Sequence, residues 1–446
     1  MPRSSVKLCI GRILARLEGF GYFFRWRPVG FPLVCHHGRL FTYKERPLTE
    51  LLAPAGNLEK LRFAANYGAD AVYFGLDQFS LRSYAGNLTL DEANLGIDYL
   101  HTRNKRGYCA LNIYPFADEY PLLLDRAKNL EAMGVDGLIV ADIGVIAMLK
   151  NQGIQTPIHV STQANTVSFQ TVEVLKQLGA KRVNLARELS FEQIAQLQQS
   201  ITDQDIETEV FVHGSVCFSM SGRCAISDYL TGRRANRGEC THPCRWQYHL
   251  VEEKRPGVYM PVTEDDRGLY FFNSKDLALF PYVRNLMQIG VNSLKIEGRM
   301  KSIHYLAGVL SLYRRVMDGE TVSEDEGMRL LGRIRNRGYS HGFMKGSIEP
   351  DDYKIEKSSS VADSLFLGYI TEDVIPGKSV MDIRNKTFAG DNVEILKTDG
   401  TVSEATLPAM LIDVKNEPMA HASHGKQLVL PFELPSYSII RRMEEQ

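Results

Sequence analysis

From Leu51 onward, the hydrophobic and polar positions of the chain repeat one arrangement. A run with helical spacing ends at a glycine and a short apolar run follows directly, as happens around Gly68, Gly134, Gly179 and Gly290. Glycine commonly ends a helix because it adopts the left-handed conformation without steric strain. The repeated unit is therefore predicted to be a helix followed by a strand.

The remaining apolar runs complete a set of eight predicted strands. These are Glu50–Ala53, Ala71–Gly75, Tyr108–Asn112, Gly137–Ala141, Ile158–Thr162, Arg182–Arg187, Glu209–Val212 and Ser293–Ile296. Two helix starts are marked by Asn57 as a cap and by Ser190 with Gln193 as a capping box. Strands that alternate with helices predict an α/β fold, a parallel (β/α)8 barrel of the TIM type, with an open doubly wound sheet as the alternative.

Polar residues follow directly after most of these strands. In a parallel barrel the carboxyl ends of all strands meet at one end, where active sites lie. The residues there include Asn112, Asp142, Gln163, Asn165, Arg187, Glu188, His213, Lys295, Glu297 and Arg299. Such groups would suit a small substrate with carboxylates or carbonyls, although each one alone is more often a structural cap.

The connection after the seventh strand is far longer than the others. About residues 214–273 separate this strand from its helix, and four of the seven cysteines lie there, at Cys217, Cys224, Cys240 and Cys244. An insertion at the carboxyl end of a barrel strand is expected to lie over the barrel mouth. Four clustered thiolates suit structural zinc or an iron–sulfur cluster, and the residues alone leave both open.

The same insertion is rich in arginine and aromatic residues. It contains Arg223, Arg233, Arg234, Arg237 and Arg245, with Tyr229, Trp246 and Tyr248 nearby. Guanidinium groups beside aromatic rings suit a phosphate backbone with unstacked bases, so Arg233, Arg234, Arg237, Arg245 and Trp246 are candidate RNA contacts. A solvated basic loop, or arginines that balance an anionic cluster, would explain the same residues.

The chain is predicted to have four parts. Residues 1–47 form a basic extension outside the fold, residues 48–345 the barrel with its insertion, residues 346–360 a polar linker, and residues 361–446 a small C-terminal antiparallel β-barrel. The last is inferred from short apolar runs such as SVMDIRN, separated by Gly, Asp and Lys turns.

Composition sets limits on the class of protein. The 446 residues are 44% hydrophobic and 24% charged, as expected of a folded globular chain, and the net charge of -1 means that a polyanion must meet a local basic patch. The most apolar stretch, Val135–Leu149, is too short to span a bilayer and contains two aspartates, so no membrane partner is expected. A cytoplasmic location is expected, and the basic extension leaves import into an organelle open.

The run from Glu209 to Ser227, with HGSVC and GRC in it, closely resembles the signature of the collagenase-like peptidase family U32. Other segments that look like this family are LLAPAGNLEKLRFAANYGADAVYFG, HVSTQANTVSF, NLARELS, NSKDL, SLKIEGRMKS and NRGYSHGF. The likeness covers about Leu51 to the C-terminus. It is strongest to the branch of the family that hydroxylates tRNA.

This resemblance implies an enzyme that forms 5-hydroxyuridine at the wobble position of tRNA, without oxygen and linked to prephenate. It also implies a [4Fe-4S] cluster held by the four cysteines of the insertion, supplied by the iron–sulfur assembly machinery. The ligand role of Cys244 rests on the tRNA branch alone, because the ubiquinone branch places its fourth cysteine elsewhere.

Residue chemistry agrees with a redox cofactor, because acid–base groups alone cannot hydroxylate a pyrimidine carbon. A prephenate-like dicarboxylate would need cationic partners, and Arg187, Lys295 and Arg299 are the candidates by their position in the barrel. Glu297 and His213 are further catalytic candidates at the same end.

Two other functions are open. A U32-type peptidase would use a cysteine nucleophile with a base, and His213 with Cys217 is the nearby pair, whereas GxSxG and HExxH motifs are absent from the sequence. A non-enzymatic protein that binds RNA or carries a cluster would also suit the basic insertion and the C-terminal module.

Overall fold

The computed structural model describes residues 49–80, 86–202, 205–216, 226–243, 275–347 and 362–444, with Ser219 and Cys224. Elsewhere it gives the backbone of short strands: β1 (Phe23–Trp26), β2 (Pro32–His36), β3 (Arg39–Leu40), β11 (Leu250–Val251), β12 (Tyr259–Met260), β13 (Thr263–Asp265), β14 (Gly268–Tyr270), β15 (Asn273–Ser274) and β19 (Tyr353–Lys354). The chain divides into residues 1–48, in which β1, β2 and β3 form an antiparallel sheet, and residues 49–446.

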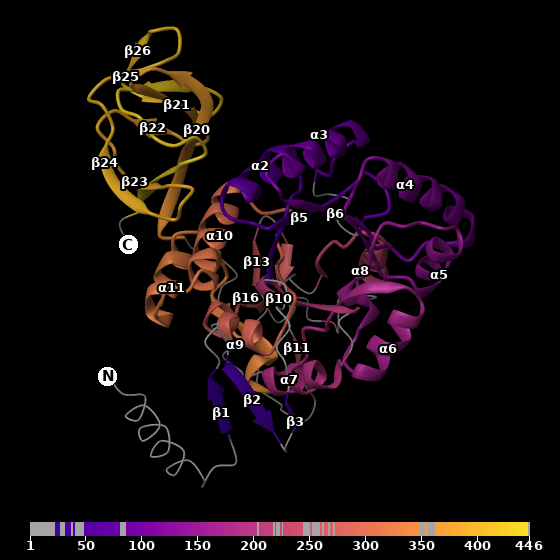
Figure 1. The fold of residues 1–446 in the computed structure, drawn as a ribbon. Helices are drawn as coiled ribbons and strands as arrows, with labels where there is room; N and C mark the ends of the chain where they lie inside the picture. Colours follow the sequence, from indigo (N-terminus) through magenta and orange to yellow (C-terminus); the bar gives the residue numbers. More distant parts are fainter. Residues whose placement is uncertain are drawn as a thin grey trace, which may run out of the picture. The chain divides into compact units, whose positions relative to one another are not determined.

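Eight parallel strands close into a barrel at the centre of the second unit (Figure 1). They are β4 (Glu50–Pro54), β5 (Ala71–Gly75), β6 (Arg106–Leu111), β7 (Gly137–Val140), β8 (Ile158–Val160), β9 (Ala180–Asn184), β10 (Glu207–Ser215) and β17 (Ser293–Ile296). The barrel is closed because β17 pairs with both β4 and β10. The predicted TIM-type fold is confirmed.

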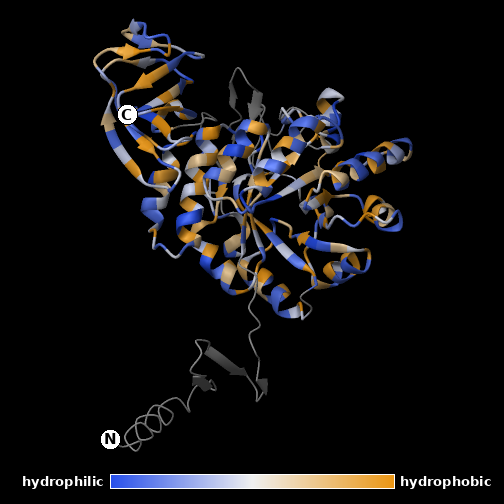
Figure 2. Cartoon of the chain, turned by 45° about the horizontal axis from the view of Figure 1, so that its top comes forward, coloured by the Kyte–Doolittle hydropathy of each residue, from blue (hydrophilic) through white to orange (hydrophobic). Residues whose placement is uncertain are grey.

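One helix follows each strand and packs outside the barrel. These helices are α2 (Leu58–Asn66), α3 (Leu90–His101), α4 (Tyr120–Ala132), α5 (Ile143–Asn151), α6 (Phe169–Gln177), α7 (Phe191–Ser200), α9 (Val283–Gln288) and α10 (Ile303–Met317). In Figure 2 they carry hydrophobic and hydrophilic stretches side by side, as helices with one face on a core do.

The predicted helix boundaries have physical markers in the structure. Asn57 accepts from the backbone of Lys60 at 2.9 Å, and Ser190 and Gln193 form the expected capping box. The glycine after each repeat's helix has positive φ, from 78° at Gly134 to 106° at Gly179. These glycines end the helices and turn the chain into the next strand.

Short elements complete the wall of the barrel and the insertion. β16 (Asp276–Ala278) pairs antiparallel with the end of β10, and β18 (Tyr339–Ser340) pairs with β16. The remaining elements are η1 (Ala117–Glu119), η2 (Thr162–Ala164), α8 (Ile226–Thr231), η4 (Ala235–Arg237), η6 (Phe280–Tyr282), α11 (Glu324–Gly332) and η7 (Gly342–Lys345). The insertion thus leaves the barrel at β10 and its chain returns beside the same strand.

Charged residues fill the amino-terminal half of the barrel interior, which we call the floor network. Glu50 accepts from Arg182 at 2.7 Å, from the hydroxyl of Tyr108 at 2.6 Å and from Ser293 at 3.1 Å. Arg106 pairs with the same carboxylate at 2.5 Å. Residues at alternate positions of a strand point to one face, so these side chains meet inside the ring.

Glu209 is the second acceptor of the floor network. It pairs with Lys295 at 2.7 Å, and it accepts from Asn184 at 2.7 Å. Burial alone would raise the pKa of Glu209, but the charges of Lys295 and Arg182 hold it below its usual value. The carboxylate is therefore ionised and its buried charge is compensated.

The C-terminal module is an antiparallel β structure, as predicted. Its six-stranded sheet has the order β24 (Val402–Thr406), β23 (Asn392–Leu396), β29 (Ile439–Met443), β20 (Ser364–Ile375), β21 (Lys378–Ile383) and β28 (Gln427–Leu430). Two ribbons accompany it, formed by β22 (Thr387–Phe388) with β27 (His421–Ala422) and by β25 (Leu411–Ile412) with β26 (Pro418–Met419). Within the described residues the edge strands β24 and β28 do not pair with each other.

The C-terminal module is fastened to the barrel helices. The hydroxyl of Tyr67, on the loop after α2, donates to the carbonyls of Leu396 and Tyr437 at 3.0 and 2.9 Å. Arg384 pairs with Glu59 of α2.

In the described part of the chain, no helix is both long and apolar enough to cross a bilayer.

Candidate functional site at the barrel mouth

Two arginines lie at the carboxyl ends of barrel strands. Arg187, after β9, donates from Nη1 to the carbonyl of Ser215 at 3.0 Å and places its guanidinium 4.0 Å from the centre of the Phe211 ring. Arg299, after β17, donates to Ser80 Oγ at 2.6 Å. A Cβ atom at Gly75 would lie 2.0 Å from Arg299 Nη1, so glycine at the end of β5 makes room for this guanidinium. Positive charge therefore gathers at the mouth.

Tyr73 is the buried phenol close to both arginines. Its hydroxyl donates to the carbonyl of Ile296 at 3.0 Å and lies 3.2 Å from Glu297 Oε2. Burial raises the pKa of Tyr73 well above its usual value and the Glu297 carboxylate raises it further, while Arg299 and Arg187 act in the opposite direction. Tyr73 is thus a neutral donor that holds Glu297 in the mouth.

Lys295, the third cation that the sequence places at this end, belongs to the floor network. Its ammonium is 2.7 Å from Glu209 and 4.5 Å from the centre of the Tyr73 ring. Its charge is already balanced inside the barrel. Of the three predicted cationic partners, Arg187 and Arg299 are therefore the two that the structure places at the mouth.

His213 lies among aromatic side chains on the helix side of β10. A register shift between Phe211 and His213 interrupts the pairing of β10 with β17. The imidazole Nδ1 is 3.3 Å from the hydroxyl of Tyr313, and the rings of Tyr305 and Tyr339 are also adjacent. Burial lowers the pKa of His213 to about 3, so the imidazole is neutral at physiological pH.

The base of the insertion is clamped to the barrel through Ser215. Its carbonyl accepts from Arg187, and its hydroxyl donates to Asp276 at 3.1 Å and accepts from Arg337 at 3.0 Å. Just before it, Gly214 has φ of 110°, and a Cβ atom there would lie 2.4 Å from the carbonyl of Glu297. Only glycine fits this close approach, which fixes the chain three residues before Cys217.

The insertion crosses the mouth of the barrel. Arg237 of η4 donates to the carbonyl of Tyr114 at 2.9 Å and pairs with Glu119, both in the connection after β6. The insertion begins at β10, which lies four places from β6 in the ring of eight strands and therefore opposite to it. The insertion thus begins on one side of the mouth and is held on the opposite side through Arg237.

Two of the four clustered cysteines, Cys224 and Cys240, lie among the described residues. Backbone N–H groups point at both sulfurs, from Ile226 to Cys224 Sγ and from His242 to Cys240 Sγ, each at 3.4 Å. The segments that carry the two cysteines are joined by a hydrogen bond from the Thr241 backbone to Ser227 Oγ at 3.2 Å. N–H groups directed at sulfur stabilise thiolates, which are the form that binds metals and clusters.

The other two cysteines, Cys217 and Cys244, lie outside the described residues, as do Arg245 and Trp246. Among the residues that are described, no three metal-binding side chains converge on one point. Cys224 and Cys240 are not joined in a disulfide. The predicted four-cysteine ligand set therefore stays a prediction.

The predicted RNA contacts separate into two kinds. Arg233 and Arg234 are exposed. Arg237 is committed to Glu119 and lies with its guanidinium 4.4 Å from the centre of the Phe116 ring. The side chain of Arg237 thus docks the insertion, while the other two face solvent.

The sequence matches two family profiles. "Peptidase family U32" matches residues 56–353, and "Peptidase family U32 C-terminal domain" matches residues 363–441. The chain belongs to peptidase family U32.

Relatives within this family carry different names. The "tRNA hydroxylation protein P" of Escherichia coli (strain K12) is 34% identical over 397 residues, which cover 79% of this chain and 87% of that protein. The protein of the same name from Helicobacter pylori (strain ATCC 700392 / 26695) is 39% identical and covers 73% of this chain and 78% of its own. A "Collagenase" of Porphyromonas gingivalis (strain ATCC BAA-308 / W83) is 27% identical, over 67% of this chain and 73% of its own.

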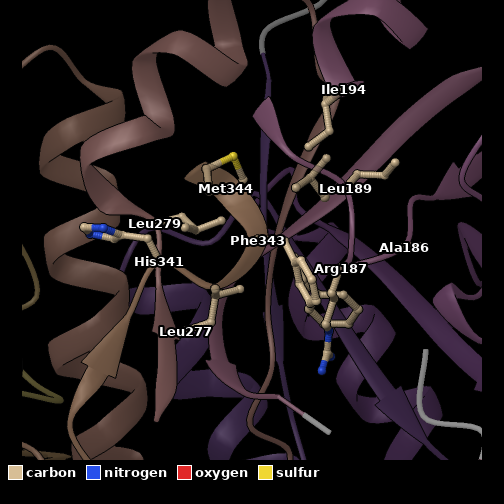
Figure 3. Close-up of a pocket in the computed structure, with 11 residues that line it drawn as sticks. Ala186, Arg187, Leu189, Ile194, Leu277, Leu279, His341, Phe343 and Met344 are labelled. Atoms are coloured by element: carbon tan, nitrogen blue, oxygen red, sulfur yellow. The ribbon is translucent and has the colours of Figure 1, made fainter. Parts of the chain in front are cut away.

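A small apolar pocket adjoins the mouth of this U32 protein. Leu189, Ile194, Leu279 and Met344 line it together with Arg187, whose guanidinium points away from these four residues in Figure 3. Its volume of about 10 Å³ has room for about one water molecule. The residues that line the pocket pack beside Arg187, and the pocket is too small to hold a nucleoside.

Of the polar residues near the mouth of this U32 protein, one is a helix cap and three others were not predicted from the sequence. Asp142 caps α5 and also accepts from Tyr120, which is the structural role that such residues often have. Tyr73, Ser215 and Arg337 were not singled out. Ser215 lies at the carboxyl end of β10 and could have been found by that position, whereas Tyr73 is in the middle of β5 and the role of Arg337 depends on a contact across 122 residues.

Proposed function

We propose that this U32 protein is a tRNA hydroxylase that forms 5-hydroxyuridine at the wobble position. One observation carries the proposal: an insertion with clustered cysteines and exposed arginines crosses a barrel mouth that holds Arg187 and Arg299. Two relatives that cover more than two thirds of the chain are named for tRNA hydroxylation. Basic groups beside a polar mouth suit a polyanionic substrate with one reacting base.

The cysteines of the insertion suit a redox group. Replacing the C5 hydrogen of uridine by a hydroxyl is a two-electron oxidation, for which amino-acid side chains have no carrier. We propose that Cys217, Cys224, Cys240 and Cys244 hold a [4Fe-4S] cluster, which when bound supplies one-electron redox chemistry. The N–H groups directed at Cys224 and Cys240 fit an anionic sulfur site.

The mouth arginines suit a small acid as co-substrate. Arg187 donates to a neutral carbonyl, and within the described residues no carboxylate balances its charge. We propose that Arg187 and Arg299 bind the carboxylates of a prephenate-like dicarboxylate, with Tyr73 and Glu297 beside it. Charge-assisted hydrogen bonds from guanidinium groups orient carboxylates strongly.

The geometry favours a hydroxylase over a peptidase of the collagenase type. His213, the base nearest in sequence to Cys217, lies with its Nδ1 against Tyr313 and its ring among further tyrosines. A general base must reach the proton that it removes, and this imidazole is fully buried. A peptidase would need another base.

Mass spectrometry of tRNA nucleosides tests the proposed function. A strain that lacks the gene should lose 5-hydroxyuridine from tRNA, and the wild-type gene should restore it. Cys224→Ser and Cys240→Ser should fail to restore it and should lack bound iron after anaerobic purification. Cys109→Ala is the matched control, because Cys109 is a buried core residue outside the insertion. Unchanged tRNA nucleosides in the deletion strain would contradict the proposal.

Reconstitution distinguishes an enzyme that acts alone from the third possibility, an accessory protein without catalytic activity of its own. Anaerobically purified protein with bound iron, prephenate, unmodified tRNA and a small-molecule acceptor for the two electrons should form 5-hydroxyuridine without other proteins. Product that appears only when cell extract is added would make the protein an accessory. Cleavage of a peptide library by iron-free protein would instead support the peptidase.

A further inference from the structure

Two aromatic side chains stand exposed where the insertion meets the barrel mouth. Phe116, in the connection after β6, is 52% exposed, and Tyr229 of α8 is 88% exposed. Leu230 of α8 is 41% exposed. We call Phe116, Tyr229, Leu230, Arg233 and Arg234 the rim surface.

Phe116 is held rigidly although half of it faces solvent. Its backbone N–H donates to Glu119 Oε2 at 2.6 Å, and the same carboxylate pairs with Arg237 of the insertion. The guanidinium groups of Arg237 and Arg234 lie 4.4 and 5.4 Å from the centre of its ring. An exposed aromatic ring that is held in place beside cations can stack with another planar group.

Tyr229 is presented in the same way by α8. Ser227 faces the insertion, where its hydroxyl lies 3.0 Å from Thr241 Oγ1 and no part of it is exposed. Two residues further, Tyr229 lies about 200° around the helix from Ser227. The contacts of Ser227 therefore orient the phenol ring of Tyr229 outward. Tyr229 is exposed because of this orientation and not because a core residue lacks a neighbour.

The charge of the rim surface is positive. Arg233 and Arg234 are exposed, and the Arg234 guanidinium lies over the Phe116 ring. Within the described residues, no carboxylate lies at ion-pair distance from the Arg234 guanidinium, whereas the Arg237 charge is matched by Glu119. A chain with a net charge of -1 has no general attraction for anions, so this is a local patch.

We propose that the rim surface binds unpaired nucleotides of RNA, with bases stacked on Phe116 and Tyr229 and phosphates at Arg233 and Arg234. This inference rests on the proposed function, since the rim surface adjoins the mouth in which a base would react. Single-stranded nucleic acid is bound by aromatic stacking beside guanidinium groups. An acidic peptide would use the arginines but would leave the two rings without a stacking partner.

Fluorescence anisotropy with two RNAs tests the surface. One RNA is the anticodon stem-loop of a tRNA with a wobble uridine, and the other is a fully paired hairpin of equal length. Phe116→Ala and Tyr229→Ala should each weaken binding of the stem-loop about 5- to 150-fold and leave the paired hairpin unaffected. Arg233→Ala with Arg234→Ala should weaken both RNAs and should reduce the salt dependence, by about 0.7 in slope for each lost contact.

Phe388→Ala is the matched control. This ring, on β22 of the C-terminal module, is 40% exposed and has the Lys386 ammonium 5.0 Å from its centre. It shares the exposure and the nearby cation but lies outside the rim surface, so its loss should leave stem-loop binding unchanged. Three outcomes would each overturn the proposal. Phe388→Ala could weaken stem-loop binding as much as the rim variants do, the Phe116 and Tyr229 variants could bind like wild type, or an acidic peptide could compete fully with the stem-loop.

The surface and the proposed function fail in different ways. If the two aromatic variants bind the stem-loop like wild type while wild-type protein forms 5-hydroxyuridine, the rim surface is wrong and the hydroxylase stands. If the variants lose stem-loop binding but tRNA nucleosides are unchanged in the deletion strain, the surface stands and the reaction is wrong.

Discussion

The two ends of the barrel hold similar charged side chains in different surroundings. At the amino-terminal end, Glu50 and Glu209 are matched by Arg182 and Lys295 at 2.7 Å, and all four residues are buried. At the carboxyl end, Arg187 donates to a backbone carbonyl. In the described residues its charge has no carboxylate partner.

This difference separates structural from functional charge. A buried charge without a partner is strongly destabilising, so the floor network contains carboxylates and cations at contact distance. An uncompensated cation at a half-exposed mouth raises the local concentration of anions. Four predictions test the contrast, from the largest expected effect to the smallest.

The largest effect is expected in the floor network. Glu209→Gln removes the charge that balances Lys295 and should lower the free energy of unfolding by about 3–5 kcal/mol. Glu207→Gln is the control, because Glu207 pairs with the same Arg182 but is 37% exposed, and it should lose under about 1 kcal/mol. Urea denaturation followed by circular dichroism measures both. Equal losses would show that burial does not distinguish the two carboxylates.

Substitution of Arg187 at the mouth should lower activity much more than stability. Arg187→Gln should lower the rate of 5-hydroxyuridine formation about 100-fold, as when one charge-stabilising donor is removed from an active site. Its unfolding free energy should fall by about 1 kcal/mol, the worth of the hydrogen bond to Ser215. Arg126→Gln, a half-buried arginine on α4, should keep the rate. A normal rate in Arg187→Gln would return this residue to a structural role.

Acid should weaken the fold through buried neutral histidines. The pKa of His213 is lowered to about 3 by burial, so between about pH 6.5 and pH 3 the unfolded chain binds the proton and the folded chain does not. Stability from this residue is therefore lost as the pH falls, by about 2 kcal/mol at pH 5.

A variant isolates that histidine. His213→Leu should flatten the decline in unfolding free energy between pH 7 and pH 5 by that amount, whatever its stability at pH 7. His101→Gln is the control, because His101 is exposed and pairs with Asp136 at the surface. A decline of the same slope in His213→Leu and wild type would exclude His213 as its source.

The smallest effect is expected where the insertion docks. Arg237→Ala breaks the pair with Glu119 and should lower overall stability by about 1 kcal/mol or less. Hydrogen exchange of residues 114–119 should nevertheless become faster, since the insertion no longer covers them. Glu119→Gln should have the same effect, and the double variant should add little to either. Additive effects would mean that the two side chains act separately.

The barrel was predictable because its signals are local. Helix caps at Asn57 and Ser190 and the glycine stops lie within a few residues of the elements that they end. The strand β10 was predicted as Glu209–Val212 but runs Glu207–Ser215, because its last residues pair with β16, about 60 residues later. Local pattern cannot supply such a partner.

The parts that could not be predicted depend on distant contacts. Lys295 was predicted at the mouth, yet it pairs with Glu209, 86 residues earlier in the chain. Arg237 was grouped with the RNA contacts, yet its partner is 118 residues earlier. In β29, Arg441 is buried against Glu394, so a charged residue stands where an apolar one would have marked the strand.

The attachment of the insertion at both β10 and the connection after β6 has a consequence for the order of assembly. These two points are far apart in the sequence and come within reach of each other only when the ring of strands has closed. Loop-closure entropy opposes such a long-range contact until the strands between them have paired. The insertion is therefore expected to dock on the connection after β6 late in folding, when most of the barrel has already formed.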